Sequence, residues 1–166
     1  MRARSLTRAA LLLAALAGIG ACNQQQPSDI SGKPQTAAPS EPTHQDFGDF
    51  QVHYNALRTD ELAASVARAY GIERSANRVL LNVAMLARRT DGSTVPVDGS
   101  VSVRAYNLNG QLKDLQMRRI TEGDSLYFIG EVGIAGAEIL VFDIDAQPNG
   151  APGSYQVQFK REFFAD

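Results

Sequence analysis

Apolar and polar residues alternate along much of the chain from residue 50 onward, and this period of two predicts β-strands. In the first such run, Phe50, Val52 and Tyr54 alternate with polar side chains, which indicates one buried and one solvent-facing side. Residues 78–87 are apolar on nearly both sides, so this strand is expected at the centre of a sheet. The pattern predicts seven strands, at residues 50–57, 78–87, 100–107, 112–121, 125–132, 139–145 and 155–163.

One helix is predicted, over residues 60–70, with Thr59 as its N-cap. Leu62, Val66 and Tyr70 recur every four residues and would form one apolar stripe along this helix. A glycine follows directly after the last of them, at the position that favours a left-handed helix cap.

Short strands separated by turn sequences, among them Asn109-Gly110, are typical of antiparallel sheets. The expected fold class is therefore all-β: an immunoglobulin-like antiparallel β-sandwich of about seven strands with one short helix. The chain has no Trp and a single Cys, so the buried Trp and the disulfide of true immunoglobulin domains are absent.

The N-terminal residues have the features of an export signal. Three arginines precede an apolar run over residues 9–20, which is too short to cross the roughly 30 Å hydrocarbon core of a bilayer. The run ends in Ile19-Gly20-Ala21-Cys22, which resembles the lipobox of bacterial lipoprotein precursors. The resemblance implies that residues 1–21 are a signal peptide and that Cys22 is acylated after cleavage. The alternative is an ordinary signal peptide with an incidental Cys.

Residues 22–46 are expected to be the acylated Cys and a disordered tether, because Pro, Gln, Ser and Thr dominate and little apolar surface is available for burial. All 12 aromatic residues of the chain lie at or after Phe47. This change in composition places the β-sandwich domain at residues 47–166. His44 falls in the tether and is expected to be inert.

Composition and charge exclude several classes of function. The formal charge is −2, and loss of the three signal-peptide arginines leaves 13 basic against 18 acidic residues, a charge of about −5. A nucleic-acid binder would normally carry a basic patch, so no nucleic-acid partner is expected. One Cys and two His leave no cysteine zinc site and little material for a histidine-rich metal site.

Several segments of the predicted domain resemble one known family. They include Phe50-Gln-Val-His-Tyr-Asn-Ala-Leu57, Asn107-Leu-Asn-Gly-Gln-Leu112 and Phe142-Asp-Ile-Asp145. They are similar to domain-of-unknown-function family 4426, a family of small exported Gram-negative proteins, and the resemblance runs from about residue 47 to the end. It implies a compact exported β domain, and it brings no catalytic residues with it.

His53 is the only His in the predicted domain, on the polar side of the first strand beside Asn55. A role as general base or nucleophile partner would require other groups to converge on it, and the chain has no Gly-x-Ser-x-Gly elbow. A solvated His53 is the alternative.

Tyr70, Arg74 and Arg78 lie in and around the loop between the helix and the second strand. The two guanidinium groups could recognise an anionic ligand, because guanidinium binds carboxylates bidentately. Alternatively, each pairs with an acid of the domain and fixes the loop.

Asp143 and Asp145 lie two residues apart on one predicted strand and therefore share a face. A calcium ion would need six or more oxygen ligands, and no loop supplies them. A solvated face, salt-bridged to Arg118 or Lys160, is the alternative, and no metal or cofactor site is predicted.

The sequence thus favours a non-enzymatic binding or envelope-interaction module. It would bind a ligand or partner through His53, Asn55, Tyr70, Arg74 and Arg78, with an envelope protein as candidate partner. The alternative is a small hydrolase-like or ligand- or metal-binding protein that uses His53 with nearby carboxylates.

The expected location is the periplasmic side of the cell envelope. The protein would be held on the lipid bilayer through acylated Cys22. Asn23 follows that Cys, where Asp is the usual inner-membrane signal by resemblance to lipoproteins, so the outer membrane is favoured over the inner.

Overall fold

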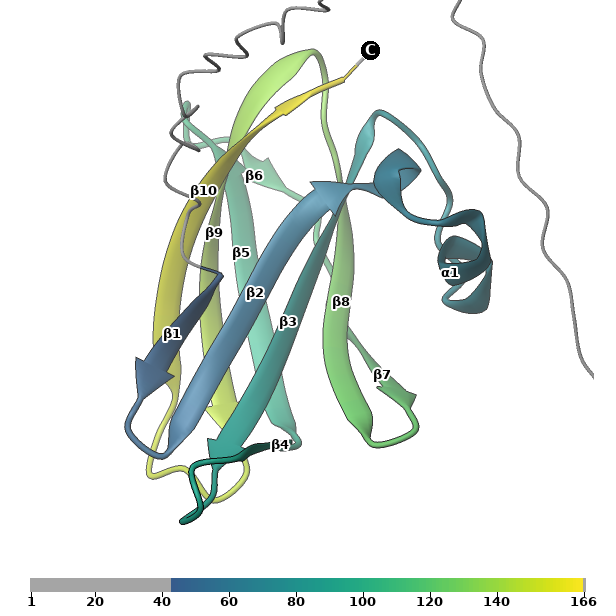
Figure 1. Ribbon diagram of the computed structural model, residues 1–166. Coiled ribbons are helices and arrows are strands. Elements are labelled where there is room, and N and C mark those ends of the chain that lie inside the picture. Colours follow the sequence, from purple (N-terminus) through teal and green to yellow (C-terminus); the bar gives the residue numbers. More distant parts are fainter. Residues whose placement is uncertain (1–42, 166) are drawn as a thin grey trace, which may run out of the picture. The chain divides into compact units, whose positions relative to one another are not determined.

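A computed structural model of the protein describes residues 43–165 (Figure 1). The predicted signal peptide, Cys22 and almost all of the predicted tether lie outside the described residues. No helix in the described part of the chain is both long and apolar enough to cross a membrane.

Within residues 43–165, ten strands form two antiparallel sheets that face each other, so the predicted all-β sandwich is confirmed (Figure 1). Sheet A has the order β1-β2-β3-β8-β7, with β4 paired to β3, and sheet B has the order β10-β9-β5-β6. The strands are β1 (His44–Phe47), β2 (Phe50–Arg58), β3 (Arg78–Arg88), β4 (Thr94–Pro96), β5 (Gly99–Asn107), β6 (Leu112–Lys113), β7 (Arg118–Glu122), β8 (Ser125–Gly133), β9 (Ala137–Pro148) and β10 (Tyr155–Phe164).

The core lies between the two sheets and is formed by the alternating inward side chains of the long strands. Leu81 of β3 and Phe142 and Ile144 of β9 are fully buried there. Phe159 stacks between Phe142 and Tyr54, with ring centroids 4.9 and 4.8 Å apart, and so joins the two sheets. Burial of these side chains supplies the main favourable contribution to folding.

The predicted helix is shorter than expected. Residues 59–61 form a 3-10 turn (η1, Thr59–Glu61), and only Ala64–Ala69 form an α-helix (α1). Thr59 is buried and does not cap a helix, because its hydroxyl bonds the backbone of Ser75 instead. Gly71 does adopt the predicted left-handed conformation, with φ 64°.

The apolar side of this region packs on the outside of sheet A (Figure 1). Ala67 and Ile72 are buried against Leu80 of β3 and Ile129 of β8, while Leu62 and Tyr70 are partly buried beside them. Val66, the central residue of the predicted stripe, remains 40% exposed. A second, smaller apolar cluster therefore forms on the outer face of sheet A.

The predicted strand at 112–121 is two strands in different sheets, because the chain crosses from β6 in sheet B to β7 in sheet A. Leu115 and Met117 lie in this crossover and pack against the core. A Cβ on Gly130 of β8 would lie 2.7 Å from side-chain atoms of both residues, so a larger residue there would force these side chains to move.

The domain begins before the predicted boundary at Phe47. β1 starts at His44 and pairs antiparallel with β2, with His44 opposite His53. Phe47 stacks on Tyr155 of β10 at 4.5 Å, and this contact attaches the short strand to the opposite sheet. His44 thus belongs to the folded domain rather than to the tether.

Candidate functional site

A groove runs over the outer face of sheet A. Along β2 and β3, buried side chains alternate with outward ones, and the outward side chains of these strands and of β8 line two depressions of about 510 and 230 Å³. Both depressions are lined by Asn55, Asn82 and Tyr127, so they adjoin. We call them together the sheet A groove.

Two asparagines form the middle of the sheet A groove. Asn55 of β2 lies directly opposite Asn82 of β3 in the strand register. The Oδ1 atom of Asn55 accepts a hydrogen bond of 2.9 Å from Arg161, whereas the buried Oδ1 atom of Asn82 has no hydrogen-bond partner among the described residues. A buried acceptor without a donor is unusual in folded proteins and calls for an explanation.

One end of the groove is formed by α1 and its neighbours. Leu62, Val66 and Tyr70 line it on the helix side. The Tyr70 hydroxyl donates a hydrogen bond to Glu122 of β7, and this bond to a carboxylate raises the pKa of Tyr70. Arg118 of β7 donates a 2.6 Å bond to the Tyr70 carbonyl and so holds the end of the helix against sheet A.

His53 lies at the other end of the groove. Its ring stacks on that of His44 with centroids 5.1 Å apart, and its Nε2 atom is 3.3 Å from Oε1 of Gln51. Burial, and then the proximity of His44, lower the pKa of His53 below its ordinary value of 6.5, although Asp46 acts in the opposite direction. His53 is therefore neutral at pH 7.

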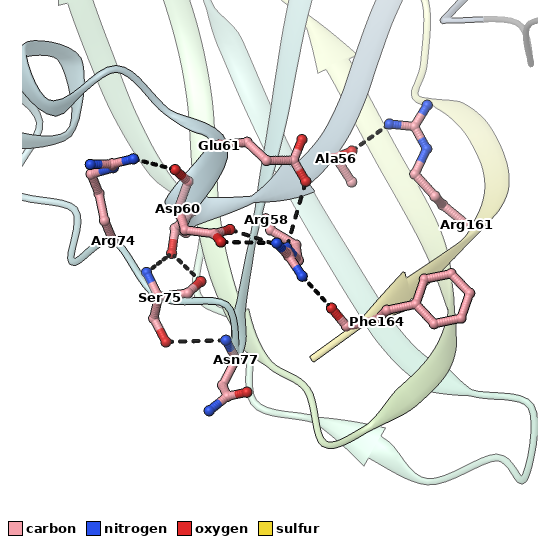
Figure 2. A network of polar contacts seen from close by, with 10 residues as sticks. Ala56, Arg58, Asp60, Glu61, Arg74, Ser75, Asn77, Arg161 and Phe164 are labelled. Carbon is pink, nitrogen blue, oxygen red and sulfur yellow. Dashed lines mark hydrogen bonds and ion pairs between the residues drawn. The ribbon is translucent and has the colours of Figure 1, made fainter. Parts of the chain in front are cut away.

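Arg74 and Arg78 both contact groups of the domain. Arg74 donates to the backbone carbonyl of Asp60, next to the bonds between Thr59 and Ser75 (Figure 2). Arg78 lies 3.9 Å from the carboxylate of Glu131. Arg74 thus ties the loop after α1 to a backbone carbonyl and not to an acid, while Arg78 lies within ion-pair distance of Glu131.

Figure 2 also shows how the end of β10 is attached to sheet A. Arg58 donates 2.9 and 3.1 Å bonds to Asp60 and a 2.6 Å bond to the carbonyl of Phe164. Arg161 reaches across from β10 to Asn55 and to the carbonyl of Ala56. These bonds occupy the edge of β2 beyond the end of β1.

Asp143 and Asp145 lie on the outer face of sheet B, where a shallow depression of about 540 Å³ is found. Asp143 pairs with Arg104 at 3.1 Å and accepts a 2.6 Å bond from Gln158, so neither Arg118 nor Lys160 is its partner. Because His53 lies on the outer face of the opposite sheet, the predicted combination of His53 with these carboxylates does not form. No group of three potential metal-ligating side chains occurs among the residues that the structure describes.

The groove thus brings together His53, Asn55 and Tyr70 of the predicted site residues, along one face, and leaves Arg74 and Arg78 outside it. Asn82 and Tyr127 were not predicted. The signal for Asn82 is present in the sequence, because it is the single polar residue within the apolar run Val79–Ala87.

Fold and groove define an antiparallel β-sandwich domain with a partly apolar groove on one outer face. Residues 44–166 match the family model of DUF4426, a domain of unknown function. The protein belongs to the DUF4426 family, as the sequence resemblance indicated.

A crystal structure of a DUF4426 family protein from Pseudomonas aeruginosa is similar to this chain at 32% identity, with a TM-score of 0.63 and coverage of 74% of this chain and 94% of that one. A copper-bound variant of FetP from uropathogenic Escherichia coli is similar at 11% identity, with a TM-score of 0.50 and coverage of 72% and 93%. Identity this low shows a shared fold alone. Comparison with curated proteins gave no match.

Proposed function

We propose that the protein is a lipid-anchored binding module on the periplasmic side of the cell envelope, with its ligand site in the sheet A groove. The sequence supports the anchoring, because a lipobox-like Ile19-Gly20-Ala21-Cys22 ends a signal-like apolar run. Diacylation and N-acylation of Cys22 would provide more than one fatty chain, and two or more chains hold a protein stably on a bilayer. The outer membrane is the proposed destination, because Asn23 and not Asp follows the Cys.

The observation that carries the binding role is the buried, unpartnered Oδ1 atom of Asn82 at the centre of the groove. Leaving such an acceptor unsatisfied costs about 1–3 kcal/mol, so an apolar residue would stabilise the domain better at this place. A ligand that donates a hydrogen bond here would recover that cost. The apolar side chains around it would supply contact area to the same ligand.

Anchoring is tested by cell fractionation. The Cys22→Ser variant is expected to leave the membrane fraction and to lose the mass of the acyl groups. A variant that still sediments with membranes at the lipidated mass would contradict the anchoring proposal.

Groove binding is tested by photo-cross-linking in living cells. Benzoylphenylalanine replaces Tyr127 in the groove and, as the matched control, Gln156 on the outer face of sheet B, which is exposed and lines the opposite depression. Adducts are expected from the Tyr127 position and not from the Gln156 position, and Asn82→Leu is expected to weaken them. Equal adducts from both positions would refute a ligand site in the groove.

A further inference from the structure

The charge of the sheet A groove restricts its ligand. No Lys or Arg lines either depression in the described part of the chain, and the single carboxylate is that of Glu122, at the α1 end. Only one oxygen of that carboxylate is bonded to Tyr70. Arg161 contacts the groove only through Asn55, to which its guanidinium group is already bonded. A cation at the α1 end would meet the carboxylate of Glu122.

The dimensions of the groove restrict the ligand further. Its floor follows the outward residues of β3 from Leu80, through Asn82, to Leu86. This part of the strand rises about 20 Å, at roughly 3.3 Å per residue. Leu57, Leu62, Ile120 and Ile129 add apolar walls at the α1 end. A ligand that fills the groove is therefore long, narrow and largely apolar.

The centre of the groove requires a hydrogen-bond donor. A carboxamide presents an acceptor beside two donors, and a peptide group presents a donor and an acceptor of the same kind. An acyl chain has no donor and would leave Asn82 Oδ1 unsatisfied. A saccharide that fills the whole groove would place hydroxyl groups against Leu57, Leu62, Ile120 and Ile129 at the α1 end, where these side chains offer no hydrogen-bond partners.

Building on the proposed function, we propose that the sheet A groove binds an extended polypeptide segment. Apolar side chains of the segment contact the walls, a backbone N–H of the segment donates to Asn82 Oδ1, and a Lys or Arg of the segment pairs with Glu122 at the α1 end. The outer face of sheet A is thus a peptide-binding surface that selects peptides in which a basic residue lies at a fixed distance from the backbone amide bonded to Asn82.

The test is selection from a display library of random nine-residue peptides against the full chain reconstituted in lipid nanodiscs. The enriched sequences are expected to be apolar, poor in Asp and Glu, and to carry one Lys or Arg at a constant position. Selection against Glu122→Lys is expected to replace the basic residue by an acidic one. Selection against the control Glu162→Lys, an exposed carboxylate on β10 of sheet B, is expected to leave the motif unchanged.

The affinity of a selected peptide for the Asn82→Leu variant is expected to fall about tenfold, because the peptide N–H then lacks its acceptor. Absence of enrichment, or a motif that Glu122→Lys does not alter, would overturn the peptide assignment. The cross-links from the Tyr127 position show whether only the peptide assignment fails or the groove is not a binding site at all. Adducts of a lipid or glycan there would retain the groove as a binding site and exclude polypeptide, whereas absence of adducts would refute both.

Discussion

Replacing Asn82 by Leu separates the stability of the domain from its binding role. Asn82 lies in the middle of β3, in a sheet, where asparagine is a poor residue and large aliphatic residues are better accommodated. Its buried Oδ1 atom has no donor among the described residues. If the residue is retained for ligand binding, its removal makes the unliganded domain more stable and less able to bind.

The magnitude follows from two contributions. Removing an unsatisfied buried acceptor recovers about 1–3 kcal/mol. Leu at this half-buried position adds about 1 kcal/mol if roughly 40 Å² of apolar surface leaves water at about 25 cal/mol per Å². Part of this sum is lost to imperfect packing, so we expect the free energy of unfolding to rise by about 1–3 kcal/mol. The midpoint of thermal unfolding should then rise by about 4 °C for each kcal/mol.

Urea unfolding of the unliganded protein measures this change as a higher midpoint at constant slope. The matched control is Asn55→Leu, at the residue directly opposite in β2, whose Oδ1 atom does accept a bond from Arg161. Asn55→Leu should be neutral or destabilising, because it removes a partner of a guanidinium group. A loss of stability in Asn82→Leu equal to that in Asn55→Leu would refute the claim that Asn82 is unsatisfied without ligand.

Three further predictions concern stability. Gly130→Ala should destabilise the domain by about 1–3 kcal/mol, because its Cβ would lie 2.7 Å from side-chain atoms of the crossover between β6 and β7. Gly133→Ala on the same strand has open space around it and should not destabilise the domain. Urea unfolding of both variants measures the difference. Lys113→Met should cost about 3 kcal/mol at pH 7, because it breaks a 2.6 Å ion pair with Glu138 in which both side chains are less than one-fifth exposed. Burial disfavours ionisation of Glu138, but the hydrogen bonds from Lys113 and Asn107 and the charge of Lys113 together outweigh it and lower the pKa of Glu138 below 4.5. This contribution to stability is therefore present above pH 4.5 and should disappear as the pH falls further, which urea midpoints of both proteins along a pH series would show. Burial is the main cause that lowers the pKa of His53 below 6.5 in the folded domain, so the unfolded chain binds a proton at higher pH than the folded one. The free energy of unfolding should therefore fall as the pH drops below 6.5. The variant His53→Gln should remove this part of the pH dependence of the unfolding midpoint.

Most of the fold was predictable from local patterns. Six of the seven predicted strands occur within a few residues of their expected ends, because alternation of apolar and polar side chains reports directly which side of a strand is buried. The one strand error has a tertiary cause. Residues 112–121 were predicted to be one strand because Leu115 and Met117 share a register, yet the chain crosses between the sheets there. The two side chains pack against the core close to Gly130 of β8, a contact that the segment itself does not show.

The candidate site was predictable only in part. His53 and Asn55 were identified as polar residues on the outer side of β2, but nothing in their own segment shows that Asn82 lies opposite. The partner of Asp143 was wrongly expected on β7 or β10 and is Arg104, because β5 is the neighbour of β9 on that side. His44 was assigned to the tether because its segment is short and polar. Its strand belongs to the domain because Phe47 stacks on Tyr155 of the opposite sheet, a contact that the local sequence does not show.

The amino-acid sequence was sufficient to determine the all-β class, the residues that point into the core and the membership of the DUF4426 family. These depend on periodicity and on short segments, which are properties of residues close together in the chain. The groove and its unpartnered Asn82 depend on which strands become neighbours and on where α1 packs. That choice is made by burial of surface between residues far apart in the chain, so only the tertiary structure decides it.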